Sequence, residues 1–137
     1  MNTNKLTSEK AYQFIHGGNS VFTVLNTLTK NRFTYKVKRH KVEDVYFVNV
    51  LVNPDTYVYI GFLKHGNFIL SKKSKFSKDS QSVKVFNYIY TKLKIGNLPD
   101  IIEFWHEGKC GKCGRSLTVP ESIDSGFGPE CIKKIVK

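Results

Sequence analysis

The sequence predicts an α+β fold, in which an antiparallel sheet of about five strands carries helices on one face and a small module follows it. Three observations predict this class. Residues 32–39 alternate apolar with polar or basic side chains, which is the period of a half-buried strand. Residues 80–94 place apolar side chains on one stripe of a helix. All three cysteines lie between residues 110 and 131, in a segment too short for a second hydrophobic core.

The first helix is expected over residues 8–16. Thr7 suits an N-cap, and the pair Gly17-Gly18 supplies a glycine C-terminus. Strands joined by short turns rich in Asn, Gly and Pro come next, and such strands pair as an antiparallel meander. They are expected at residues 20–29, 32–39, 45–52, 57–63 and 68–70.

A second helix over residues 80–94 is expected to cover one face of this sheet and to end before Gly96 and Pro99. Residues 98–105 are apolar enough to dock onto the sheet part. We therefore expect two parts: a basic α+β domain over residues 1–102 and a metal module over residues 103–137.

Positive charge is concentrated in the first part. Residues 1–102 contain 16 Lys and Arg against 6 Asp and Glu, a net charge of +10, whereas residues 103–137 contain 6 against 5, a net charge of +1. A basic excess of this size favours nucleic acid or another polyanion as the partner. The sheet part, and not the cysteine segment, is therefore expected to meet that partner.

The composition also argues against membrane, secreted and disulfide-rich classes of protein. No apolar run approaches the ~18 residues of a membrane helix, and the first residues lack the apolar stretch of a signal peptide. The odd number of cysteines argues against a disulfide framework and for a reducing compartment. We expect a soluble, cytoplasmic protein.

The cysteine segment predicts one structural zinc ion. Cys110 and Cys113 form Cys-x-x-Cys-Gly, in which glycines let the backbone turn so that both sulfurs face one metal. Gly128-Pro129 favours a helix start, which places Cys131 in the first turn of a helix over residues 130–136. A knuckle followed by a ligand at a helix N-terminus is a treble-clef-like arrangement. Plain surface thiols are the less favoured alternative.

Three cysteines leave one coordination position to fill. His106 stands four residues before Cys110 and is the first choice for the fourth ligand. The alternatives are water or one of five other side chains: Asp124, Glu130, His16, His40 and His65. A catalytic zinc would need an open position and a nearby acid or base. His106-Glu107 only distantly matches the deaminase pattern, so we expect no enzyme.

The string Cys-Gly-Lys-Cys-Gly-Arg-Ser-Leu-Thr-Val-Pro-Glu-Ser-Ile-Asp-Ser-Gly-Phe-Gly-Pro-Glu-Cys resembles a zinc-binding domain of unknown function that is common in phage, prophage and plasmid proteins. Segments 18–23, 32–37 and 57–61 are similar to the region that often precedes that domain. The resemblance implies a mobile element acting in a host cytosol. Some small zinc-containing phage proteins similar to this one are anti-CRISPR inhibitors of type II effector nucleases.

Two functions follow as expectations. The first is a phage protein that inhibits a host nucleic-acid machine by binding it, best represented by a CRISPR effector nuclease. The alternative is a zinc protein that binds DNA or RNA directly. In either case the expected contacts are basic side chains of the sheet part: Lys36, Lys38, Arg39, Lys41, Lys72, Lys73, Lys75 and Lys78. Tyr35, Tyr57 and Phe76 lie among them and are candidates for base stacking, although we expect Tyr35 and Tyr57 to be core residues.

Overall fold

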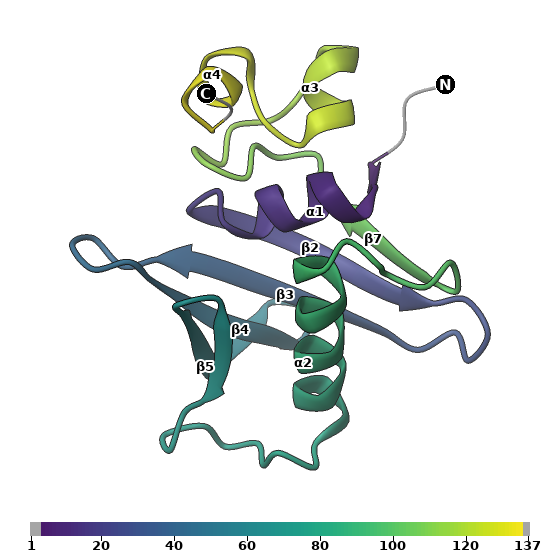
Figure 1. Ribbon diagram of the computed structural model, residues 1–137, viewed down its shortest axis with the longest axis vertical. Coiled ribbons are helices and arrows are strands. Elements are labelled where there is room, and N and C mark those ends of the chain that lie inside the picture. Colours follow the sequence, from purple (N-terminus) through teal and green to yellow (C-terminus); the bar gives the residue numbers. More distant parts are fainter. Residues whose placement is uncertain (1–3, 136–137) are drawn as a thin grey trace.

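The computed structural model describes residues 4–135 and shows one seven-stranded antiparallel sheet with helices (Figure 1). The strands are β1 (Lys5–Leu6), β2 (Asn19–Asn26), β3 (Arg32–Arg39), β4 (Val45–Asn53), β5 (Thr56–Lys64), β6 (Asn67–Leu70) and β7 (Ile102–His106). The helices are α1 (Ser8–Ile15), α2 (Gln81–Lys94), α3 (Pro120–Ser125) and α4 (Pro129–Ile135). Within residues 4–135, no helix is both long enough and apolar enough to span a membrane.

The predicted α+β class is confirmed, and the predicted meander is present as β2-β3-β4-β5-β6. The strand order is β1-β7-β2-β3-β4-β5-β6, so two strands join the sheet beyond the expected five. Strand β7 pairs with β2, so that Trp105 lies opposite Thr23 and Phe104 lies opposite Val24. The short β1 then pairs with the outer edge of β7. The predicted boundary between residues 102 and 103 therefore falls inside β7.

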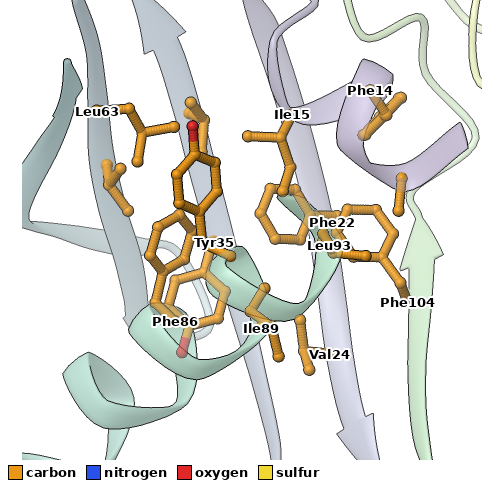
Figure 2. Packing of buried hydrophobic residues seen from close by; sticks show 14 of the residues in the cluster. Phe14, Ile15, Phe22, Val24, Tyr35, Leu63, Phe86, Ile89, Leu93 and Phe104 are labelled. Atoms are coloured by element: carbon orange, nitrogen blue, oxygen red, sulfur yellow. The ribbon is translucent and has the colours of Figure 1, made fainter. Parts of the chain in front are cut away.

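Both long helices cover the same face of the sheet (Figure 1). Helix α1 buries Ala11, Phe14 and Ile15, and α2 buries one stripe of apolar side chains against alternate residues of the strands. Tyr35 is fully buried beneath α2, where its ring meets Phe86 at 5.1 Å between centroids and its hydroxyl donates to the carbonyl of Ser82 at 2.6 Å. These side chains form one continuous core (Figure 2).

No described helix lies on the opposite face of the sheet, which we call the open face. Along each strand, residues of the open face alternate with buried residues. Residues of this face also lie opposite one another on neighbouring strands: Lys36 lies opposite Asn49, and Asn49 lies opposite Tyr59. The open face includes Val21, Thr23, Leu25, Thr34, Lys36, Lys38, Phe47, Asn49, Leu51, Tyr57, Tyr59, Phe62, Ile69, Glu103 and Trp105. Unlike a typical solvated sheet face, it is rich in aromatic rings.

The C-terminal segment packs directly on α1. Phe127 is fully buried and its ring lies 5.8 Å from that of Phe14. The backbone is close as well, because the N–H of Asn19 donates to the carbonyl of Gly111 at 2.8 Å. A Cβ at Gly17 would lie 2.5 Å from the same oxygen, so only glycine allows this approach. The segment thus shares the core of the sheet part.

A half-buried histidine links α1 to α2. His16 Nδ1 lies 2.9 Å from the carbonyl oxygen of Tyr12, and its Nε2 lies 2.9 Å from the hydroxyl of Tyr90. A neutral ring satisfies both contacts, with Nδ1–H donating to the carbonyl and Nε2 accepting from the hydroxyl. Burial lowers the pKa of His16 below 6.5, against the opposing effects of the Tyr12 carbonyl and of Asp44. Folding therefore favours the uncharged imidazole.

This histidine predicts loss of stability in mild acid. Below pH 6.5 the unfolded chain takes up a proton at His16 before the folded chain does, so stability falls as pH decreases from that value. We expect His16→Gln to weaken the pH dependence of the urea midpoint between pH 7.5 and 5.5. Any loss of metal is common to both proteins, since the three cysteines are unchanged. Parallel profiles for the two proteins would contradict this assignment.

Candidate metal centre

A tight turn after β7 brings the first two cysteines together. The N–H of Cys110 donates to the carbonyl of Arg115 at 2.8 Å, and the N–H of Gly114 donates back to the carbonyl of Cys110 at 2.9 Å. Gly114 has φ 79°, a left-handed conformation that glycine adopts without strain. The turn directs the Cys110 and Cys113 side chains to one side.

The third cysteine comes from α4. Pro129 begins this helix, one residue before the predicted range of 130–136, whose last residue lies outside the described part of the chain. Cys131 lies in the first turn, as predicted. The Sγ atoms of Cys110, Cys113 and Cys131 all lie within 4.8 Å of one another. Three sulfurs this close fit the thiolate ligands of a metal ion such as zinc, each of which lies at about 2.3 Å from the ion.

The backbone already stabilises negative charge on Cys110. Its Sγ accepts hydrogen bonds from the N–H groups of Lys112 at 3.4 Å, Cys113 at 3.5 Å and Gly128 at 3.4 Å. Burial raises the pKa of this thiol, but the three donors outweigh that effect and the pKa falls to about 7. Cys110 is therefore prepared to act as a thiolate, the form in which cysteine binds metals.

Cys131 shows the opposite behaviour. Burial and the neighbouring sulfurs of Cys110 and Cys113 raise its pKa to about 11. Three thiolates within 4.8 Å repel one another strongly. A divalent cation at their centre removes this repulsion and lets all three ionise. A bound metal ion would therefore complete the charge balance of the cluster.

The cluster opens onto a cavity of about 210 Å³. Besides the three cysteines, its walls come from the turn after Gly114 and from the start of α4. Glu130 lines this cavity, and its carboxylate lies 3.9 Å from Lys133 Nζ at the exposed surface. The fourth side of the metal position therefore faces solvent-accessible space.

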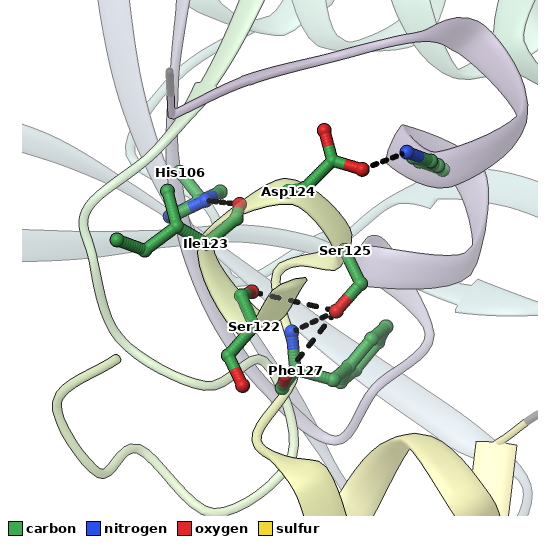
Figure 3. A network of polar contacts seen from close by, with 7 residues as sticks. His106, Ser122, Ile123, Asp124, Ser125 and Phe127 are labelled. Atoms are coloured by element: carbon green, nitrogen blue, oxygen red, sulfur yellow. Dashed lines mark hydrogen bonds and ion pairs between the residues drawn. The ribbon is translucent and has the colours of Figure 1, made fainter. Parts of the chain in front are cut away.

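His106 does not join the cysteines. It is 2% exposed and ends β7 beneath α3. Its Nε2 lies 2.6 Å from the carbonyl oxygen of Ile123 (Figure 3), and its Nδ1 accepts the N–H of Gly108 at 2.9 Å. Because both ring nitrogens have backbone partners, neither has a lone pair left for a metal. In this geometry His106 is a structural link between β7 and α3, which differs from its expected role as fourth ligand.

This placement makes a direct prediction. We expect His106→Ala to retain one zinc ion per chain while losing about 2–4 kcal/mol of stability, since two buried backbone groups lose their partners. His106→Gln, whose amide can still donate to Ile123, should lose less. Zinc content by mass spectrometry and urea unfolding measure the two effects. Loss of zinc in both variants would restore the imidazole as a ligand.

The other expected fourth ligands also lie elsewhere, apart from Glu130. Asp124 forms an ion pair with Lys10 of α1 at 2.7 Å (Figure 3). His16 is half-buried between α1 and α2, where its two ring nitrogens lie near the Tyr12 carbonyl and the Tyr90 hydroxyl. Among residues 4–135, the group of side chains able to hold a metal consists of the three cysteines alone.

The expected basic contacts do not form one patch. Lys36 and Lys38 lie on the open face, whereas Arg39 alternates to the helix face and lies 3.8 Å from Asp44. Lys41 is exposed in the turn between β3 and β4. The four remaining lysines lie in the loop between β6 and α2, at the lower end of Figure 1. They are Lys72, Lys73, Lys75 and Lys78, all exposed.

The three aromatic candidates for stacking also separate. Tyr35 is fully buried, as expected. Phe76, in the loop between β6 and α2, packs against the core, so its ring is not available for stacking. The expectation that Tyr57 is a core residue is wrong, because it lies half-buried on the open face with Lys36 Nζ 5.6 Å from its ring centroid. Two other aromatic residues of this face, Tyr59 and Trp105, are not singled out by the sequence as candidates for stacking.

Comparison with known proteins gives one match. Neither the curated proteins nor the solved structures contain a match to this chain. The matching part begins in β7 and covers the cysteine turn, α3 and α4, so it contains the whole metal centre. Residues 104–136 match the model of a family described as "Family of unknown function (DUF6011)".

Proposed function

We propose that this protein binds nucleic acid through its sheet part, and that its cysteine segment holds one structural zinc ion. The observation that supports the binding function is the division of charge, with +10 in residues 1–102 and +1 in residues 103–137. A zinc ion bound to three thiolates does not make the net charge of residues 103–137 more positive. A zinc finger that binds phosphate groups would instead carry most of the positive charge in the cysteine segment.

The structural role of the zinc rests on size and chemistry. Residues 107–135 contain two short helices and contribute only Cys110 and Phe127 to the fully buried apolar core. Such a segment needs a metal to fold, and a structural zinc supplies about 10–16 kcal/mol of apparent binding free energy. We propose no catalytic role, since His106, the imidazole nearest to the cysteines in the sequence, has both nitrogens engaged by the backbone.

We propose solvent or Glu130 as the fourth zinc ligand. Glu130 directly precedes Cys131 and lines the cavity at the cluster. Rotation of its exposed side chain away from Lys133 costs little, because surface ion pairs contribute at most about 1 kcal/mol.

Inhibition of a type II CRISPR effector nuclease is the second proposal. It is supported by the resemblance of the cysteine string to phage zinc domains and by the same basic excess, which suits guide RNA or an acidic protein surface. Such an inhibitor would bind an effector at one-to-one stoichiometry and block its cleavage.

One experiment separates these two functions. The zinc-loaded protein is titrated against labelled DNA and RNA at two salt concentrations, beside a pull-down against purified type II effectors. Direct binding should weaken with salt, with a logarithmic slope of about −0.7 per phosphate for single strands and −0.9 for duplex DNA. Capture of an effector together with weak binding of free nucleic acid would favour inhibition. Absence of both kinds of binding would overturn both proposals.

A further inference from the structure

We propose that the open face of the sheet is a stacking surface for single-stranded RNA. This inference rests on the proposed binding of nucleic acid and adds the class of ligand and the surface that takes it. The basic loop between β6 and α2 then contributes at most general attraction.

The aromatic content of the open face is the first argument. Five rings lie there, all half-buried: Phe47, Tyr57, Tyr59, Phe62 and Trp105. None of them belongs to the core cluster or to the residues packed against it. Phe47 and Tyr59 contact each other at 6.0 Å between centroids, and Phe47 also contacts His40 at 5.8 Å. Aromatic rings that are partly exposed on one face of a sheet and are not packed against the core favour an interaction site.

Charge is the second argument. Lys36 and Lys38 stand among the rings, and no Asp or Glu occurs in β3, β4 or β5. The carboxylate of Glu103, on β7, lies 3.4 Å from Lys5 Nζ and accepts the indole N–H of Trp105 at 3.2 Å. Burial raises the pKa of Tyr57, and the negative charge of Glu107 adds to this effect. The centre of the face is therefore positive.

Rings and ammonium groups in alternation fit one kind of ligand. The rings offer stacking surfaces for bases, and the lysines offer charge for the phosphates between them. Strands β7 to β5 span four strand spacings, about 19 Å, so the surface is long enough for several nucleotides. A duplex hides the faces of its bases, which makes the unpaired strand the better ligand.

Neutral polar groups favour RNA over DNA. Asn49 lies between Lys36 and Tyr59 in the strand register, and the Thr23 and Thr34 hydroxyls lie 2.7 Å apart nearby. An amide and hydroxyls next to a phosphate-binding lysine are suited to the ribose 2′-hydroxyl, which both donates and accepts. An acidic protein partner would use the lysines but would leave the five rings without a role.

The chain supplies a closely matched control for the test. Lys36 lies 5.6 Å from the ring of Tyr57 on the open face, and Lys92 lies 5.7 Å from the ring of Tyr88 on α2. The double variants Lys36→Gln/Tyr57→Leu and Lys92→Gln/Tyr88→Leu lose the same charge and the same ring from opposite sides of the molecule. Thermal unfolding first confirms that both variants fold.

The zinc-loaded proteins are then titrated by fluorescence anisotropy with labelled oligouridylate of about 12 nucleotides, a length within the range that small binding domains cover. Oligothymidylate of that length and an RNA duplex are the comparison ligands, and polyglutamate is the competitor. We expect oligouridylate to bind most tightly. We expect the Lys36/Tyr57 variant to weaken its binding about tenfold or more, and the Lys92/Tyr88 variant to change it less than about twofold.

Four results would overturn the inference while leaving nucleic-acid binding intact. They are equal weakening by the two variants, duplex RNA bound as tightly as the single strand, oligothymidylate bound as tightly as oligouridylate, and displacement by polyglutamate at matched charge. Absence of binding to every nucleic acid would instead remove the proposed function itself.

Discussion

Cys110→Ser is expected to abolish zinc binding, from one ion per chain to nearly none, and to unfold residues 107–135. Cys110 is the buried member of the cluster and accepts three backbone N–H groups, so its loss removes both a ligand and the centre of the turn. Loss of a structural zinc forfeits about 10 kcal/mol or more of apparent binding free energy. Metal analysis and limited trypsin digestion measure the two effects.

Ser116→Ala is the control, because Ser116 is exposed in the same segment. It should retain zinc and resist trypsin like the parent chain. The strand signal in circular dichroism should persist in Cys110→Ser, since the pairings of β2 to β6 do not involve the cysteines. A zinc-free but protease-resistant Cys110→Ser protein would show that the metal is not needed to keep this segment folded.

Phe14→Ala is expected to cost about 3–5 kcal/mol of unfolding free energy, a large share of the stability of a small domain. Phe14 is fully buried, and its ring lies within 7 Å of four other rings. Three of them belong to strands of the sheet, including the imidazole of His106 in β7, and the fourth is Phe127 of the cysteine segment. Its removal leaves a cavity where the two parts of the chain join.

Phe47→Ala provides the comparison. Phe47 is half-buried on the open face and makes no contact with the core cluster, so the same truncation should cost markedly less in urea unfolding. Phe14→Ala should also increase trypsin cleavage within residues 107–135, because Phe127 loses its neighbour. Equal costs for the two variants would contradict the position assigned to the core.

Local pattern was sufficient for the meander and the long helices. Residues 32–39 alternate strictly, and β3 has those bounds. The turn before Asn67 has positive φ at both His65 and Gly66, as a two-residue hairpin requires. Strand β7 was missed because residues 102–106 combine apolar and charged side chains over a short length, and only pairing with β2 makes them a strand.

The site was predictable to the extent that it is local. The three cysteines lie within 22 residues of chain and their spacing indicates a shared metal, which the cluster geometry supports. His106 is close to Cys110 in sequence, but the strand directs its ring toward Phe14 and α3. Tyr57 belongs to a run of apolar residues without alternation, and a bulge between β4 and β5 shifts the register there. The side of the sheet on which Tyr57 lies is therefore set by the pairing of β5 with β4 and not by the sequence of its own segment.

We propose that the sheet part binds nucleic acid while the cysteine segment only stabilises the fold. Amide chemical shifts of the zinc-loaded, isotope-labelled protein, measured during titration with oligouridylate, test this division most directly. We expect perturbations centred on β3, β4 and β5, around Lys36, Asn49 and Tyr57, with small changes in residues 107–135. Perturbations confined to residues 107–135 would contradict it.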